Sequence, residues 1–349
     1  MTDMDRLVVD GWGKHIGIEN SQIVVKARKE GGGYSVIHRC PPSNLRQLII
    51  SGKGSISTSA IESLASNGTD IILIDWRGNV KARVSPPIMR TVNTRRKQYL
   101  AYHQTTGAYL AREFVHCKMR NQIAVLGTLA KTRKDTHPEI SKALKNARNT
   151  ISISLERIKD TRCESCDQIR SHLLGMEGNA AASYWAVIQD MIGDEFEFQG
   201  RSGRYASDPL NAMLNYGYAV LESEAWRAIH YAGLDPYGGF LHVDRPGRPS
   251  MVLDLMEEFR QQVIDKTIFT FFSRNQVKPR QFTVEDGVCV MDDKPRKLLL
   301  STLLSKMEEH TRYKNKKMRW TDLVLTQARK IGKFLRRETK TYKGFWSRW

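Results

Sequence analysis

The sequence predicts an α+β protein in which a small β-rich N-terminal domain precedes a larger all-α domain. Short apolar segments separated by Gly, Asn or Pro fill residues 1–83, as expected of strands joined by turns. After residue 94 the chain is rich in Ala, Leu, Arg, Lys and Glu, with long stretches free of Pro and Gly, which favours successive helices. A chain of 349 residues is also long enough for two hydrophobic cores.

The N-terminal elements follow from their apolar patterns. Five segments are expected to be strands: residues 6–10, 15–19, 21–28, 34–38 and 45–51. Residues 57–66 instead place apolar side chains near helical spacing, and Asn67-Gly68 would end such a helix. The apolar run at 70–75 then returns to a strand. We therefore expect one helix inserted among strands.

A linker is expected at residues 84–94, before a helical domain that spans residues 95–349. Pro86 and Pro87 exclude the interior of a helix or of a central strand at this point. One helix of the second domain has a clear beginning, because Asp208 can accept hydrogen bonds from free backbone amides and Pro209 suits the first helical position. That helix is expected to run to about residue 232, where Gly233 would end it.

The positive charge of the chain indicates a nucleic-acid partner. Lys and Arg number 55 against 37 Asp and Glu, a net charge of +18. Residues 311–349 hold 13 of these basic residues and two acidic ones, with aromatic residues between them. Aromatic rings are costly to leave in water, so we expect them to dock onto the protein while the cations face outwards. The aromatic residues singled out in this basic C-terminal segment are Trp320, Phe334, Tyr342, Phe345, Trp346 and Trp349.

The composition also excludes several classes of protein. The longest apolar runs fall short of the roughly 18 residues that a membrane-spanning helix needs. The first residues carry acidic groups and lack the pattern of a secretory signal, and five scattered cysteines do not make a disulfide framework. The pair Cys163 and Cys166 has no second pair with which to complete a structural zinc site. We expect a soluble cytoplasmic protein with no membrane contact.

Three segments carry residues suited to a metal site. Asp254, Glu257 and Glu258 lie three and four positions apart, so a helix would place them on one face, where a cation or solvent must relieve their repulsion. Glu177 precedes a run of small residues that allows close packing of helices, and His242 follows a turn that contains Gly. Taken singly, each has a simpler explanation: a solvated acidic face, a carboxylate in the first turn of a helix, and a histidine of the core.

A histidine together with carboxylates suits Mg²⁺ or Mn²⁺ with coordination positions left for water and phosphate. The chain contains no HExxH, no P-loop and no GxSxG motif, which removes common competing enzyme classes. Arginines near these segments are candidate phosphate contacts. These candidates for DNA binding are Arg204, Arg245 and Arg248, together with Arg201.

The same segments resemble one protein family over an extended stretch. They read EGNAAASYW, DPLNAMLNYGYAVLESEAWRAIHYAGLDPYGGFLH and RPSMVLDLMEEFR. Together they closely resemble the CRISPR-associated endonuclease-integrase that inserts new spacers during adaptation, most strongly over residues 175–265. The N-terminal segment LRQLIISGKGSISTSAIESLASNGTDIILIDWRGNVKARVSP is similar to the β-rich domain of that family.

The resemblance implies a homodimer paired through the β-rich domains, an α-helical catalytic domain, and a complex with the small CRISPR-associated partner protein of adaptation. It implies that Glu177 and His242 are metal ligands and catalytic residues. The second carboxylate is best matched by Glu257, with Asp254 as a near-equal candidate. The implied reaction is attack by a 3′-hydroxyl of short foreign DNA on a phosphodiester at a repeat border, with Mg²⁺ or Mn²⁺ as cofactor.

Two alternatives remain open from the residues alone. The same ligands would serve a metal-dependent nuclease that cuts branched DNA in repair. An acidic cluster with a structural role would instead fit a DNA-binding scaffold without catalytic activity.

Overall fold

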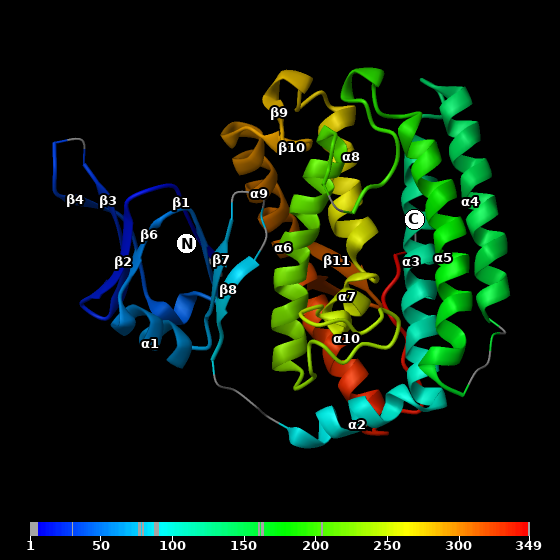
Figure 1. The fold of residues 1–349 in the computed structure, drawn as a ribbon, viewed down its shortest axis with the longest axis horizontal. Coiled ribbons are helices and arrows are strands. Elements are labelled where there is room, and N and C mark those ends of the chain that lie inside the picture. The colour runs from blue at the N-terminus through cyan, green and yellow to red at the C-terminus, as the bar shows by residue number, and fades with distance from the viewer. Residues whose placement is uncertain are drawn as a thin grey trace. The chain divides into compact units, whose positions relative to one another are not determined.

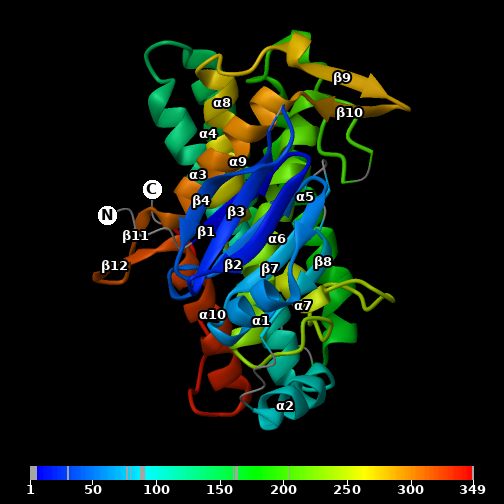
Figure 2. The same cartoon turned by 90° about the vertical axis from the view of Figure 1, so that its left-hand side faces the viewer.

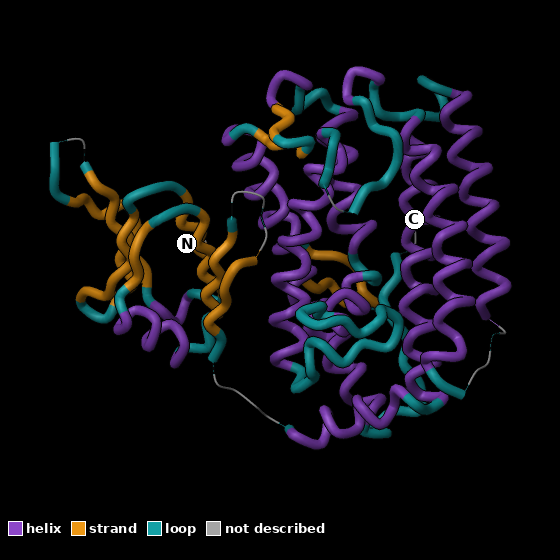
Figure 3. The backbone as a smooth tube through the Cα atoms, in the orientation of Figure 1, coloured by secondary structure: helices purple, strands orange, loops and turns teal. Residues whose placement is uncertain are grey.

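The computed structural model describes residues 6–29, 31–75, 78, 80–86, 91–159, 161, 164–203 and 205–347. The chain falls into two units, Met1–Ile88 and Met89–Trp349 (Figure 1). The first is rich in strands and the second in helices (Figure 3), so the predicted α+β class is confirmed. The division falls within residues 84–94, which were expected to form the linker. Residues 87–90 of this stretch lie outside the described part of the chain.

Two four-stranded sheets build the first unit. One sheet has parallel neighbours and an antiparallel edge, in the order β1 (Arg6–Asp10), β5 (Gln47–Ser51), β7 (Asp70–Ile74) and β8 (Val80–Val84). The other has the order β4 (Tyr34–Cys40), β3 (Gln22–Arg28), β2 (Lys14–Glu19) and β6 (Gly54–Ile56), in which β6 runs parallel to β2. A short helix at Pro42–Asn44 separates β4 from β5.

The helix expected between the strands is α1 (Thr58–Ser66). The hydroxyl of Ser57 accepts a hydrogen bond from the backbone N–H of Ala60 at 3.2 Å, which caps its first turn. Its buried Leu64 packs into a core shared with Ile16, Leu48 and other apolar residues of both sheets. The strands β6 and β8 were not predicted, because β6 has only three residues and β8 carries Lys81 and Arg83 among its apolar residues.

The second unit consists mainly of helices. Its first four are α2 (Val92–Tyr102), α3 (Thr105–Thr132), α4 (Pro138–Lys159) and α5 (Cys166–Gln189), of which α3, α4 and α5 pack side by side (Figure 1). The remaining helices are α6 (Pro209–Tyr231), α7 (Ser250–Met256), a π-helix at Arg260–Asp265, α8 (Lys266–Ser273), α9 (Asp293–Glu308) and α10 (Trp320–Leu335). Short 3₁₀ turns lie at Asp194–Phe196 and Pro279–Gln281.

Two small hairpins, which were not predicted, accompany these helices. They pair β9 (Phe282–Glu285) with β10 (Val288–Met291), and β11 (His310–Tyr313) with β12 (Lys316–Arg319) (Figure 2). The turn of the first contains Asp286 and Gly287, both at positive φ, which is the combination that tight hairpin turns prefer.

The predicted ends of α6 are confirmed. The carboxylate of Asp208 accepts a hydrogen bond from the backbone N–H of Asn211 at 2.8 Å, and Pro209 is the first helical residue. Gly233 follows the last turn with φ of +73°, a conformation that glycine adopts without steric cost. Among the described residues, no helix combines the length and the apolar character required to span a bilayer.

Candidate active site

Asp254 organises the backbone turn that carries His242. The carboxylate is fully buried in α7. Its Oδ2 accepts hydrogen bonds from the backbone N–H groups of Phe240 at 2.6 Å and Leu241 at 3.0 Å. Its Oδ1 accepts from the backbone N–H of His242 at 3.0 Å and lies 2.6 Å from Nδ1 of the same residue. Because a carboxylate can only accept, Nδ1 carries a proton and Nε2 of the neutral imidazole keeps a free lone pair.

Glu257 lies on the other side of the His242 imidazole, near Nε2. Its Oε1 lies 3.8 Å from Nε2 of His242 and 3.3 Å from a guanidinium nitrogen of Arg260. Its Oε2 lies 2.9 Å from the ammonium nitrogen of Lys118, and the same nitrogen lies 2.5 Å from Oε1 of Glu177. The structure therefore brings Glu177, His242 and Glu257 together from α5, the loop before α7 and the turn after it.

The charges at this site are strongly coupled. Burial alone would raise the pKa of Glu257, but the positive charges of Arg260 and Lys118 hold it at about 2, so the carboxylate is ionised. Burial alone would lower the pKa of Lys118, whereas Glu257 and Glu177 raise it above its ordinary value. The ammonium group of Lys118 thus lies between the carboxyl groups of Glu177 and Glu257.

The residues present fit a divalent cation. The Oε2 atom of Glu257 is buried and has no hydrogen-bond partner among the described residues; its contact is the ion pair with Lys118. A buried carboxylate oxygen satisfied by a cation, beside a second carboxylate and an imidazole lone pair, is a donor set that suits Mg²⁺ or Mn²⁺.

The remaining acidic residues have different surroundings. Both oxygens of Asp254 already accept hydrogen bonds, which makes it a positioning residue in this structure. Glu258 contacts Gln327 and Tyr342 and does not contact the other two carboxylates. Asp254 and Glu257 both face His242, whereas Glu258 does not, so the expectation that all three share one helix face is wrong for Glu258. Helix α7 ends at Met256, and an irregular turn precedes the π-helix.

Glu177 does not fit the simpler explanation that it is a carboxylate interacting with the dipole of a helix. It lies in the middle of α5, which begins at Cys166, and not in the first turn of a helix. Three positions further along α5, Ala180 is only 1% exposed, consistent with the expected close packing of small residues. Sequence reasoning missed Lys118 and Arg260. Arg260 could have been found from its spacing, since it follows Glu257 by three positions. Lys118 lies on another helix and has no motif around it.

A cavity of about 500 Å³ opens beside Glu177. Its lining includes the cations Lys118, Arg201 and Arg260 and the aromatic residues Trp185 and Tyr218. The guanidinium of Arg201 is held by Asn215 at 2.7 Å and lies over the ring of Tyr218. Cations and aromatic rings on the wall of one cavity are the groups that contact the phosphates and bases of single-stranded DNA.

Of the arginines proposed to bind DNA, Arg245 and Arg248 line a second pocket of about 290 Å³. Tyr99 and Tyr237 lie on the same pocket and are about half exposed. Arg204 lies outside the described residues. The role of these arginines in binding DNA stays a prediction.

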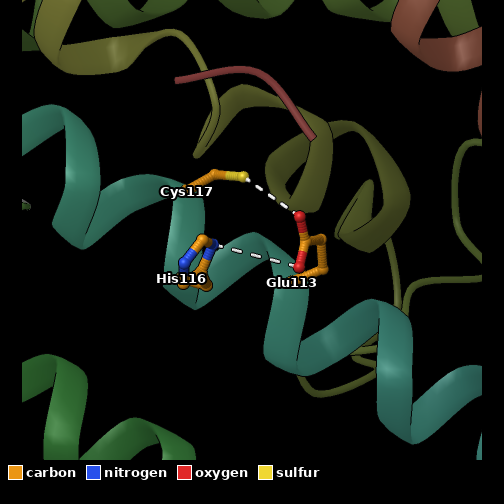
Figure 4. A group of neighbouring side chains, drawn as sticks. All are labelled: Glu113, His116 and Cys117. Atoms are coloured by element: carbon orange, nitrogen blue, oxygen red, sulfur yellow. Dashed lines mark hydrogen bonds and ion pairs between the residues drawn. The ribbon is translucent and has the colours of Figure 1, made fainter. Parts of the chain in front are cut away.

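A different group of possible ligands lies on α3. Glu113, His116 and Cys117 offer atoms within 4.8 Å of one another (Figure 4). Burial raises the pKa of the Cys117 thiol well above its ordinary value. Burial, with the positive charges of Arg120, Lys159 and Arg112, lowers the pKa of His116 to about 4. The same positive charges oppose a bound cation. Cys163 of the CxxC pair lies outside the described residues, and Cys166 is buried with a free thiol.

Comparison with known proteins identifies the family. The sequence model of "CRISPR associated protein Cas1" matches residues 7–304. A CRISPR-associated endonuclease Cas1 of Archaeoglobus fulgidus is 43% identical over 99% of this chain and the whole of its own length. Among solved structures, a casposase bound to its integration product has a TM-score of 0.83 at 24% identity, covering 97% of this chain and 93% of the casposase.

A Cas6-RT-Cas1–Cas2 complex includes a chain with a TM-score of 0.74 at 19% identity, covering 99% of this chain and 36% of that longer one. These structures share the fold with the present chain. The sequence comparisons show that the chain belongs to the Cas1 family of CRISPR-associated endonucleases.

Proposed function

We propose that this protein is a metal-dependent DNA integrase and endonuclease of CRISPR adaptation, which joins the 3′-hydroxyl ends of short foreign DNA to repeat borders of a CRISPR array. The observation that carries the proposal is that Lys118 joins the carboxylates of Glu177 and Glu257, and that the other oxygen of Glu257 faces Nε2 of His242. Family membership and the fold shared with a casposase bound to its integration product support it.

Glu177, His242 and Glu257 would hold the Mg²⁺ or Mn²⁺ ion. When bound, the metal would stabilise negative charge that develops on the attacked phosphate. Asp254 keeps the proton of His242 on Nδ1, so that Nε2 can bind a metal or accept a proton. Arg260 and Lys118 place two further positive charges beside the reacting phosphate.

The proposed reaction is a transesterification without a covalent enzyme intermediate. The 3′-oxygen of the incoming DNA forms a bond to phosphorus, and the bond from phosphorus to the 3′-oxygen of the repeat strand breaks. The proton of the attacking hydroxyl is transferred to a base, and the departing 3′-oxygen takes up a proton from water to become a 3′-hydroxyl. With water as the nucleophile, the same site would hydrolyse linear or branched DNA. Cleavage in solution is therefore compatible with integration.

The proposed partners are double-stranded and branched DNA, a second copy of the chain and the small adaptation partner protein. Pairing through the first unit remains a proposal from the resemblance. The name of the Cas6-RT-Cas1–Cas2 complex, in which a chain of similar fold occurs, supports a partner of the Cas2 type.

The test uses a supercoiled plasmid with a repeat array and a labelled short duplex with free 3′-hydroxyls. Purified protein, partner protein and Mn²⁺ or Mg²⁺ are added. We expect wild type to join label to the plasmid, and Glu177→Gln and His242→Ala to fail. Glu139→Gln, an exposed change on α4, is the matched control. Cleavage of branched DNA without joining would favour the repair nuclease, and full activity of both site variants would favour the scaffold.

A further inference from the structure

The segment at residues 341–347 contacts the turn that follows Glu257. It follows α10 in an extended conformation, and its end lies beside α3 (Figure 1). Tyr342 is 1% exposed and Phe345 is 2% exposed, whereas Lys343 between them is exposed. The expected docking of aromatic residues is thus confirmed for these two positions. We call residues 341–347 the C-terminal strap.

The strap is bound along its length by polar side chains of α3. Figure 4 shows it in faint red, passing beside Glu113 and Cys117. A Cβ atom at Gly344 would lie 2.5 Å from the sulfur of Cys117, so only glycine fits at this crossing. The backbone hydrogen bonds of the strap run from Tyr109 Oη to Tyr342 O (2.5 Å), Gly344 N to Glu113 Oε1 (3.0 Å), Asn121 Nδ2 to Phe345 O (3.2 Å) and Ser347 N to Asn121 Oδ1 (2.9 Å).

The strap also supplies donors to Glu258, the neighbour of the candidate ligand Glu257. The buried carboxylate of Glu258 accepts hydrogen bonds from the hydroxyl of Tyr342 and from the backbone N–H of Phe345 at 2.7 Å. A third donor is Nε2 of Gln327 at 2.8 Å. The ring of Phe345 stacks on that of Phe259, with centroids 5.6 Å apart and planes 5° apart. The strap therefore holds both residues that follow Glu257.

The turn formed by Glu257, Glu258 and Phe259 depends on such outside contacts. It lies between the end of α7 and the start of the π-helix. The backbone N–H groups of Glu257 and Glu258 reach the carbonyls three residues earlier at 3.3 Å, which is long for a hydrogen bond, whereas the N–H of Phe259 reaches the carbonyl of Met256 at 2.9 Å. Two of the three internal bonds of the turn are therefore long, and the contacts of the strap to Glu258 and Phe259 add to them.

We propose that the C-terminal strap is a positioning element of the active site, which fixes the turn at Glu258 and Phe259 and thereby aims Glu257 at the metal. This inference rests on the proposed function. It assigns the strap a role other than that of a DNA-binding arm, because the rings of Tyr342 and Phe345 are buried and backbone groups on both sides of Lys343 are hydrogen-bonded to the protein. The strap lies outside the residues matched by the family model, 7–304.

The first experiment compares the full chain with a chain that ends at residue 340, alone and with a synthetic peptide of residues 339–349. DNA joining and cleavage are measured at saturating DNA, together with the Mn²⁺ concentration for half-maximal rate and the Kd for DNA. Misplacement of a catalytic group by about 1 Å can cost about 100-fold in rate, and we expect a loss of that order in kcat. DNA affinity should change less than about threefold, since the cations of the cavity remain. The peptide should restore the rate.

Two point variants separate positioning from folding and from DNA binding. Tyr342→Phe removes one hydroxyl that donates to Glu258, and we expect it to lower kcat about tenfold and to raise the Mn²⁺ requirement. Lys343→Ala removes an exposed cation from the same strap and should leave kcat and the Mn²⁺ requirement unchanged. Mn²⁺ affinity is also measured without DNA, from the rise in Tm with metal concentration.

Full activity of the chain that ends at residue 340 would overturn the inference. So would a loss of DNA affinity in Lys343→Ala with a silent Tyr342→Phe, which would make the strap a DNA-binding arm. If the shortened chain does not fold, Tyr342→Phe decides, and an unchanged rate and Mn²⁺ affinity in that variant would refute positioning. Wild-type protein that processes no DNA would reject the proposed function. If Tyr342→Phe then still binds Mn²⁺ more weakly than wild type, the positioning role of the strap is retained.

Discussion

Replacement of Asp254 by Asn tests the arrangement on which the whole site depends. The carboxylate accepts four hydrogen bonds, two at each oxygen, from the backbone and imidazole of residues 240–242. The amide oxygen of Asn can serve the donors on one side, but its NH₂ group faces donors on the other, so two bonds are lost. Since a hydrogen bond to a charged acceptor contributes about 1.5–3 kcal/mol, we expect the free energy of unfolding to fall by about 3–6 kcal/mol.

This loss should lower Tm by about 6–12 °C, at about 2 °C per kcal/mol for a unit of this size. The variant should also bind Mn²⁺ more weakly, because an amide NH₂ beside Nδ1 of His242 favours the tautomer that protonates Nε2. Thermal unfolding with increasing Mn²⁺ measures both effects in one series. Asp244→Asn, an exposed change in the neighbouring loop, is the control and should shift Tm by less than about 2 °C. Wild-type stability and Mn²⁺ affinity in Asp254→Asn would refute the organising role of this carboxylate.

Three further predictions concern other parts of the second unit. Lys118→Met should tighten Mn²⁺ binding, because the ammonium no longer competes for Glu177 and Glu257, yet slow DNA cleavage; weaker Mn²⁺ binding in a thermal titration would contradict this. Gly239→Ala would place Cβ 2.6 Å from Cβ of Ser250, so urea unfolding should show a loss of about 1–3 kcal/mol, and an unchanged midpoint would count against it. The folded-state pKa of His116, about 4, lies below its unfolded value of 6.5, so its contribution to stability is present above pH 6.5 and lost as pH falls to 4. His116→Gln should reduce the fall in unfolding free energy between pH 7 and pH 4 by about 3 kcal/mol, measured by urea titration at each pH; an equally steep fall would exclude His116 as its source.

Local patterns predicted much of the fold. Alternating and continuous apolar runs located the strands of the first unit, and the cap at Asp208 with the stop at Gly233 located α6. The break after Met256 could not be read from the sequence, because residues 257–259 contain neither Pro nor Gly and continue a helical pattern. The residues of this break have partners that are distant in the sequence, among them Tyr342, which binds Glu258.

The residues of the candidate site were also predicted only in part. The residues Glu177, His242 and Glu257 were singled out by residue type and resemblance, and the structure brings them together. Lys118 was not predicted, because a lysine on a long helix gives no sign of which carboxylates it will meet. The distinction between Asp254 and Glu257 also needed the fold, since only the position of the turn at residues 240–242 determines which carboxylate its N–H groups reach.

The hydrogen bonds of the C-terminal strap have a consequence for the timing of biosynthesis. They join Glu113 to Gly344 and Asn121 to Ser347, pairs that are 231 and 226 positions apart. Helix α3 is therefore translated long before residues 344 and 347, at about 5–20 residues per second. The candidate ligands are likewise synthesised before the residues that anchor their turn, so a nascent chain lacks these anchoring hydrogen bonds until residues 342–347 have been added.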